Sequence, residues 1–475
     1  MPTITRKNIH PNLKWTQINE QGIKHVTNCQ DIVDSADQWK NILVEVAKLK
    51  KGDSVGIGAM VCDVRYLGLL YATLELGCRL LVLDKPHYKE TIQYVRSRCL
   101  APFDVYILND DAPEIVKLVG ETYANQQMYM STWFNHASPD SLPAKTFNVD
   151  GDTIGMSSPT SGSTGYPKPL HYNHNFLTAA GDRCHQLFNY KEDDKILHLS
   201  NLHHGASSAL FFFPTIKYCK EHYFEYALNR DRVDTIVNVV VKEKINKIMF
   251  PNNLVLEKFI ELLPPIDHQL DLYCLQANNK NWLTHVKRAN INSITSIYGA
   301  SEVLGPIFVN VLTPTTGENH NVLNYGKLID DFYTFKIIGD QVEVSAPHRG
   351  TFTLNDKFEI DDHGNNIFCW RADLIRINEN TMPLDFFTQA TGMYFPNSLG
   401  FVIPDTTTNK VYLLIDPSLK DQGPALITKI NDHLKIHPNL QIDFVDYVPA
   451  INFFNNIKFN YDQCRAHFRN KFNLI

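Results

Sequence analysis

Residues 160–168 read TSGSTGYPK, a run of small, hydroxyl-bearing residues that ends in a lysine. Gly162 and Gly165 tolerate positive φ and allow an anion to approach the main chain. We expect a strand before the run and a helix after it, from about Asn175, which is a setting in which backbone N–H groups bind phosphate. The Walker spacing is absent, and composition alone leaves phosphate binding and an ordinary surface loop equally open.

Two downstream strings hold acids that could serve a nucleotide or a metal. YGASE, residues 298–302, ends an expected strand, and Glu302 is either a ligand for a hard cation such as Mg²⁺ or a solvated loop acid. Asp356 and Arg371 lie in the string LNDKFEIDDHGNNIFCWRAD. A carboxylate that accepts two hydroxyl groups, beside an arginine, would hold a ribose; the alternative is a surface hairpin with acids in its turn.

Two further strings hold a candidate histidine and a candidate lysine. LSNLHHGASSALFFFP contains His203 and His204, with no cysteine or carboxylate at metal-ligand spacing, so we expect no zinc site. Its three phenylalanines, Phe211–Phe213, either line an apolar pocket or belong to the core. VPAINFFNNIKFNY contains Lys458, which is either catalytic or a solvated charge near the C-terminus.

These strings, in this order, resemble the signatures of the adenylate-forming superfamily of acyl- and aryl-CoA ligases, luciferases and peptide-synthetase adenylation domains. TSGSTGYPK matches every fixed position of the family form [ST]-S-G-[ST]-T-G-x-P-K, and YGASE resembles Y-G-x-[ST]-E. The intervals from Asp356 to Asp361, Gly364 and Arg371 match the family's T-G-D and G-R-x-D segments. The histidine string resembles P-L-x-H-G, and the lysine string resembles the family's C-terminal ending.

The resemblance implies a role for each string. Loop 160–168 would handle the β- and γ-phosphates of ATP, Tyr298 would stack on adenine, and Glu302 would hold Mg²⁺. Lys458 would be the catalytic lysine, and His204, with His203 as the fallback, would line the acid pocket. The residues expected to bind the nucleotide are Thr160, Ser161, Gly162, Ser163, Thr164, Gly165, Lys168, Ala277, Asn278, Tyr298, Gly299, Ala300, Ser301, Asp356 and Arg371.

The chain departs from the family pattern at several glycines. Pro169 stands where the family usually has glycine, and Ala277 and Asn278 stand where a glycine turn normally supports adenine. Asn378–Asn380 replaces the usual glycine after the expected hinge at Asp373. These changes keep open the interpretation that the chain is a nucleotide-binding protein that has lost its catalytic activity.

The elements that must position these residues follow an α/β pattern. A strand at 55–60, a helix ended by Gly77 and a strand at 80–83 form one unit of a parallel sheet. Alternating helices and strands recur over 233–299. The fold class we expect is a large, layered α/β domain of several sheets over 1–372 and a small α+β domain over 373–475, which the resemblance implies rotates about a hinge.

Composition and charge argue against some classes of protein. A net charge of −6 and a pI of about 6.3 argue against nucleic-acid binding. No apolar run reaches the roughly 18 residues of a membrane span. Nine cysteines without a CxxC pair, and an N-terminus without the apolar core of a secretion signal, predict a reduced, cytoplasmic protein.

The implied function is ATP-dependent activation of a carboxylic acid to an acyl-adenylate, followed by transfer to a thiol. The thiol belongs to CoA or to the phosphopantetheine of a separate acyl or peptidyl carrier protein. HHGASSALFFFP lacks the aspartate with which amino-acid-activating members hold the substrate ammonium, which favours an aryl or acyl substrate. The alternatives are a stand-alone adenylation enzyme that transfers to an amine, and the degraded nucleotide-binding protein.

Overall fold

The structure is a computed structural model. It describes residues 3–18, 24–58, 63–83, 103–109, 117, 121, 124–130, 147–159, 169–199, 207–225, 232–250, 253–275, 286–287, 289–316, 324–328, 331–339, 341–354, 356–371, 374–377, 380–383, 387, 390–391, 394–395, 399–434, 440–455 and 458–474. Statements of absence below refer to these residues.

The largest sheet has the strand order β14-β13-β12-β11-β9-β10-β1-β2. Its strands are β1 (Lys14–Ile18), β2 (Lys24–Asn28), β9 (Lys195–His198), β10 (Glu221–Glu225), β11 (Lys247–Phe250), β12 (Asp271–Leu275), β13 (Ser293–Tyr298) and β14 (Phe308–Leu312). Strands β11 and β13 are buried along their whole length, as expected of parallel strands covered by helices. The sequence predicted β11, β12 and β13, and also the helices α8 (Val233–Glu243) and α9 (Asn253–Leu262), whose apolar faces pack in the same core.

A second sheet has the order β6-β5-β3-β4-β7-β8. Its strands are β3 (Ser54–Gly58), β4 (Arg79–Leu83), β5 (Val105–Leu108), β6 (Gln127–Tyr129), β7 (Ile154–Pro159) and β8 (Pro169–Asn173). Between β3 and β4 runs α2 (Val64–Glu75), and Gly77, at φ +64°, follows its end. The predicted parallel strand–helix–strand unit is confirmed, and α1 (Cys29–Asn41) packs against α2.

The segment after residues 160–168 contains a strand that the sequence did not predict. The antiparallel edge strand β8 pairs with β7 from Pro159↔Pro169 to Ile154↔Asn173. The helix predicted from about Asn175 is confirmed as α6 (His174–Phe188), which begins directly after β8, where the Asn173 side chain accepts a hydrogen bond from the main chain of Phe176. A proline can open an edge strand because its missing N–H faces no partner strand, which accounts for Pro169.

The remaining elements lie in the later part of the chain. They are α7 (Phe213–Tyr218), β15 (Thr334–Ile338), β16 (Gln341–Ala346), β17 (Gly350–Leu354), β18 (Asp356–Ile360), β19 (Asn366–Arg371), β20 (Leu374–Ile377), β21 (Asn380–Pro383), β22 (Gly400–Asp405), β23 (Lys410–Ile415), α12 (Gly423–Leu434), β24 (Phe444–Tyr447), β25 (Phe454–Asn455), β26 (Lys458–Phe459) and α13 (Tyr461–Lys471). The strings LGFVIP and KVYLLIDP predict two strands and Pro424 predicts the start of a helix, and β22, β23 and α12 confirm all three.

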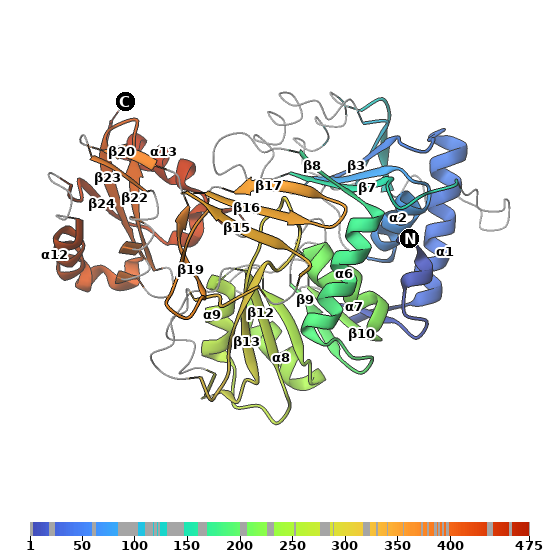
Figure 1. The fold of residues 1–475 in the computed structure, drawn as a ribbon, viewed down its shortest axis with the longest axis horizontal. Helices are drawn as coiled ribbons and strands as arrows, with labels where there is room; N and C mark the ends of the chain where they lie inside the picture. Colours follow the sequence, from blue (N-terminus) through green and yellow to red (C-terminus); the bar gives the residue numbers. More distant parts are fainter. Residues whose placement is uncertain are drawn as a thin grey trace.

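The C-terminal elements have cores of their own. Two hydrophobic clusters contain only residues from 377–474. In Figure 1 the orange-red elements β22–β24, α12 and α13 stand at the left, beyond the small sheet β15–β17. The division at residue 372/373 stays a prediction, and this layout is in keeping with it; Asp373 itself lies outside the described residues. None of the described helices has the length and apolarity needed to cross a membrane.

A buried pair of histidines makes the stability of the large sheet depend on pH. His198 Nε2 lies 3.0 Å from His222 Nδ1, and His222 Nε2 lies 3.1 Å from the carbonyl oxygen of Cys219. A carbonyl only accepts, so His222 carries its proton on Nε2 and its Nδ1 accepts from His198. Burial lowers the pKa of His222 to about 4 and holds the pKa of His198 well below its usual value.

We therefore expect the free energy of unfolding to fall as the pH drops from about 6.5 towards 4. In this window both histidines are protonated in the unfolded chain but not in the folded protein. Each histidine therefore lowers the free energy of unfolding by about 1.4 kcal/mol for each pH unit. Denaturant unfolding at a series of pH values measures the slope. His198→Gln keeps a donor for His222 but binds no proton, so its slope should be shallower; an equal slope would contradict this account.

Candidate functional site

The predicted site residues divide into three groups. Those outside the described residues are Thr160–Lys168, His203, His204, Ala277 and Asn278. Two have a described main chain only: Arg371 in β19 and Lys458 in β26. The segment Tyr298–Glu302 and Asp356 are described in full, and the geometry below rests on them.

The segment after β13 is a loop that needs a glycine at residue 299. A Cβ atom there would lie 2.4 Å from the carbonyl oxygen of Gly305, closer than any side chain can approach. The loop therefore folds back so tightly that its two ends touch across Gly299. This gives a physical reason for the glycine in the YGASE string, and it fixes the main chain that bears Glu302.

Tyr298 and Asp356, 58 residues apart, meet in the interior. The Tyr298 hydroxyl donates to Asp356 Oδ2 over 2.5 Å, and both residues are buried. The Tyr298 ring is 1% exposed and packs edge-to-face against Phe358, at 4.9 Å between centroids. A base could stack on this ring only after its neighbours move, whereas the hydroxyl already orients the Asp356 carboxylate.

Arg371 and Asp356 lie on neighbouring strands. Strands β18 and β19 are antiparallel, and their register pairs Asp356 with Arg371. The turn between them is closed by Asp361, which accepts from the main chain of His363 and Asn365. The resemblance-derived spacing therefore corresponds to a hairpin that places the two candidate ribose residues opposite each other.

Glu302 fits a role as a metal ligand. Its side chain is partly exposed, and its carboxylate has no hydrogen bond or ion pair within the described part of the chain. Mg²⁺ is usually bound by one or two carboxylates together with substrate phosphates and water. The described residues contain no cluster of three or more acids, histidines or cysteines that could hold a metal by themselves. A single carboxylate fits Mg²⁺ that also binds phosphates and water, not a metal held by protein ligands alone.

The loop after β13 is held by side chains that the sequence reasoning missed. Four residues from distant segments donate hydrogen bonds to its main-chain carbonyls: Tyr172 to Ser301 (2.8 Å), Arg349 to Glu302 (2.7 Å), Tyr333 to Val303 (3.2 Å) and Arg183 to Pro306 (2.6 Å). No motif or periodicity links these positions, because each contact depends on how the sheets pack.

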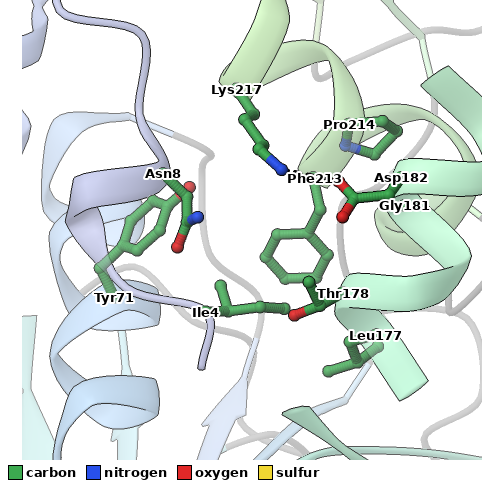
Figure 2. A pocket seen from close by; sticks show the side chains of 10 residues that line it. All are labelled: Ile4, Asn8, Tyr71, Leu177, Thr178, Gly181, Asp182, Phe213, Pro214 and Lys217. Atoms are coloured by element: carbon green, nitrogen blue, oxygen red, sulfur yellow. Dashed lines mark hydrogen bonds and ion pairs between the residues drawn. The ribbon is translucent and has the colours of Figure 1, made fainter. Parts of the chain in front are cut away.

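A pocket lies elsewhere, between the N-terminal segment and helices α2, α6 and α7. Figure 2 shows Lys217 pointing to Asp182 across it, with 2.6 Å between Nζ and Oδ1, and Phe213 beside them. All three phenylalanines are buried in core clusters, and Phe213 also borders this pocket. None of the predicted site residues that the structure describes lines this pocket.

The chain was compared with known proteins. No curated protein matches its sequence. Among solved structures, it is similar to the A-PCP structure of McyG complexed with phenylalanyl-adenylate, with a TM-score of 0.75, 14% identity, and 99% of this chain and 96% of the other covered. It is also similar to ATP-bound MatB from Rhodopseudomonas palustris, with a TM-score of 0.73, 15% identity and 97% and 96% covered.

A third similar structure is o-succinylbenzoate coenzyme A synthetase (MenE) from Bacillus subtilis in complex with ATP and magnesium ion, with a TM-score of 0.72, 14% identity, and 97% of this chain and 98% of the other covered. At these identities the likeness shows the fold. The family is shown by the sequence itself, since the profile of the AMP-binding enzyme family matches residues 20–351. The chain belongs to the family of AMP-binding enzymes.

Proposed function

We propose that the chain activates an aryl or acyl carboxylic acid with ATP, forming an acyl-adenylate and pyrophosphate, and then transfers the acyl group to a thiol. A carboxylate is a poor electrophile because its charge repels a nucleophile and it lacks a leaving group. Transfer of AMP supplies a stable leaving group. The protein's task is then to position two anions and to stabilise the charge that develops between them.

One observation supports a nucleotide site above the others. The end of β13 and the start of β18 are remote in sequence, yet Tyr298 hydrogen-bonds to Asp356, and the register of β18 and β19 sets Arg371 opposite that aspartate. We propose that Asp356 accepts the two ribose hydroxyls, with Arg371 beside it. The nearby segment Gly299–Ser301, together with Ala277 and Asn278, borders the base.

The remaining roles extend this site towards the phosphates. In our proposal the loop Thr160–Lys168 holds the β- and γ-phosphates with its main-chain N–H groups, its hydroxyls and the lysine charge. Glu302 would hold Mg²⁺, which neutralises charge on the leaving pyrophosphate. Lys458 stabilises the charge that builds between the attacking carboxylate and the α-phosphate, and His204 lines the acid pocket.

The acceptor we propose is a thiol, of CoA or of a carrier protein's phosphopantetheine. The names of the similar structures support this choice, since MenE is a coenzyme A synthetase and the McyG structure is an A-PCP structure. Rotation of residues 373–475 about the Asp373 region would withdraw Lys458 and admit the thiol, so that one site serves both reactions. We place the reaction in the cytoplasm.

Acid-dependent exchange of labelled pyrophosphate into ATP tests this function. We expect exchange with at least one member of a panel of aryl, fatty and short-chain acids, and none without acid or Mg²⁺. Mass spectrometry with CoA, a carrier protein or an amine then identifies the acceptor. Absence of exchange with every acid, by folded protein that still binds ATP, would favour a nucleotide-binding protein that has lost catalysis.

A further inference from the structure

Arg349 has an unusually complete set of contacts for a residue in a turn. It lies between β16 and β17, and its Nε donates to the carbonyl oxygen of Glu302 while its Nη1 donates to that of His171, each over 2.7 Å. Its Cζ lies over the rings of Tyr172 and Phe352, 4.9 Å from each centroid. Two hydrogen bonds and two ring contacts together fix the orientation of the group.

The two carbonyls that Arg349 joins belong to different parts of the proposed site. Glu302 lies in the loop after β13, and β13 is a strand of the eight-stranded sheet. His171 is the third residue of β8, the strand that follows the loop 160–168 directly. His171 in turn meets β7, on the other side of that loop, through a 2.7 Å contact between its Nδ1 and Ser157 Oγ.

Arg349 thus links three sheets, since it lies between β16 and β17 of one sheet and donates to β8 of the second and to the loop that follows β13 of the third. Burial lowers the pKa of Arg349, while Tyr172 and the Glu302 carboxylate act in the opposite direction. An arginine stays charged even so. Its hydrogen bond goes to the main chain of Glu302, which leaves the carboxylate available.

We propose that Arg349 is a positioning residue that fixes the Glu302 carboxylate relative to the strands at both ends of the phosphate loop. This inference rests on the proposed function, in which Glu302 holds Mg²⁺ and residues 160–168 hold the phosphates. Arg349 touches neither ligand. It sets the distance between the loop that bears Glu302 and the strands that flank residues 160–168, and both segments would bind the same Mg²⁺–phosphate group.

Kinetics of pyrophosphate exchange test whether Arg349 acts through Glu302. For Arg349→Gln we expect kcat to fall about tenfold and the half-saturating Mg²⁺ concentration to rise, with the KM for the acid unchanged. In the Glu302→Gln background, Arg349→Gln should add almost no further loss, because groups that act as a unit are not additive. Additive losses, or an equal rise in the KM for the acid, would overturn the proposal.

Arg349→Lys separates geometry from charge. A lysine ammonium is a compact point charge without the planar fork that reaches two carbonyls beside aromatic rings, so Arg349→Lys should recover little of the activity lost in Arg349→Gln. Full recovery would mean that a positive charge suffices and would overturn the proposal. Arg65→Gln is the matched control, since Arg65 pairs with Asp63 in its own helix turn and contacts neither segment. Its kinetics should equal those of the wild type.

Amide hydrogen exchange without any ligand tests the link itself. In Arg349→Gln we expect residues 169–173 and 299–306 to lose protection together. Tyr172→Phe removes the donor to Ser301 but keeps the ring, so in this variant only residues 299–306 should lose protection. If β8 does not respond to Arg349→Gln, the proposed link is wrong. If the wild type shows no pyrophosphate exchange with any acid, the proposed function fails, and this measurement still decides the link.

Discussion

Lys458→Ala is expected to lower acid-dependent pyrophosphate exchange by about 10²–10³-fold, the usual effect of removing one group that stabilises transition-state charge. The reason is specific to the first half-reaction, in which carboxylate and α-phosphate, both negative, must approach each other. Formation of thioester from supplied acyl-adenylate should continue at close to the wild-type rate, because no such approach occurs in that step. Both rates are measured on the same preparation.

Lys420→Ala is the matched control for this experiment. Lys420 is an exposed lysine in the same C-terminal part of the chain, so its removal changes the net charge equally without altering the site. Both half-reactions should be unchanged in it. Exchange by Lys458→Ala at close to the wild-type rate would show that Lys458 is not the catalytic lysine, and a parallel loss of both half-reactions would point to a folding defect.

Where the fold agreed with the sequence, the reason was local. Strand β3, helix α2 and Gly77 follow directly from apolar spacing and from a glycine with positive φ. The interval between Asp356 and Arg371 matched the family's spacing, and the structure adds what that interval did not predict, an antiparallel register that pairs the two residues. Patterns that act over a few residues survive in any tertiary context.

The errors and omissions concern contacts made between distant segments. The run PLHYN was not recognised as β8, because an edge strand opened by a proline has too few residues to show a period. The link from Arg349 to Glu302 and His171 spans 47 and 178 residues. Only the packing of three sheets brings these groups together, and no single-sequence pattern encodes that packing.

Asp356→Asn is the second substitution for which we expect a large effect, a rise of about 100-fold in the KM for ATP. Asparagine keeps the volume and can still accept from Tyr298, but it loses the charge with which the carboxylate would accept both ribose hydroxyls. Two hydrogen bonds to a charged group contribute about 1.5 kcal/mol each, and 1.4 kcal/mol is a factor of ten. The KM for the acid should change little.

Tyr298→Phe shows whether the hydroxyl acts by orienting that carboxylate. Phenylalanine preserves the packing against Phe358 and removes only the 2.5 Å hydrogen bond, so we expect a rise of about tenfold in the KM for ATP. In the Asp356→Asn background the same change should have little effect. Glu359→Gln, an exposed acid on the same strand, should leave the KM unchanged. If the effects of Tyr298→Phe and Asp356→Asn on the KM for ATP were additive, the tyrosine hydroxyl would serve the nucleotide independently of Asp356, and it would have to leave its hydrogen bond to that carboxylate when ATP binds.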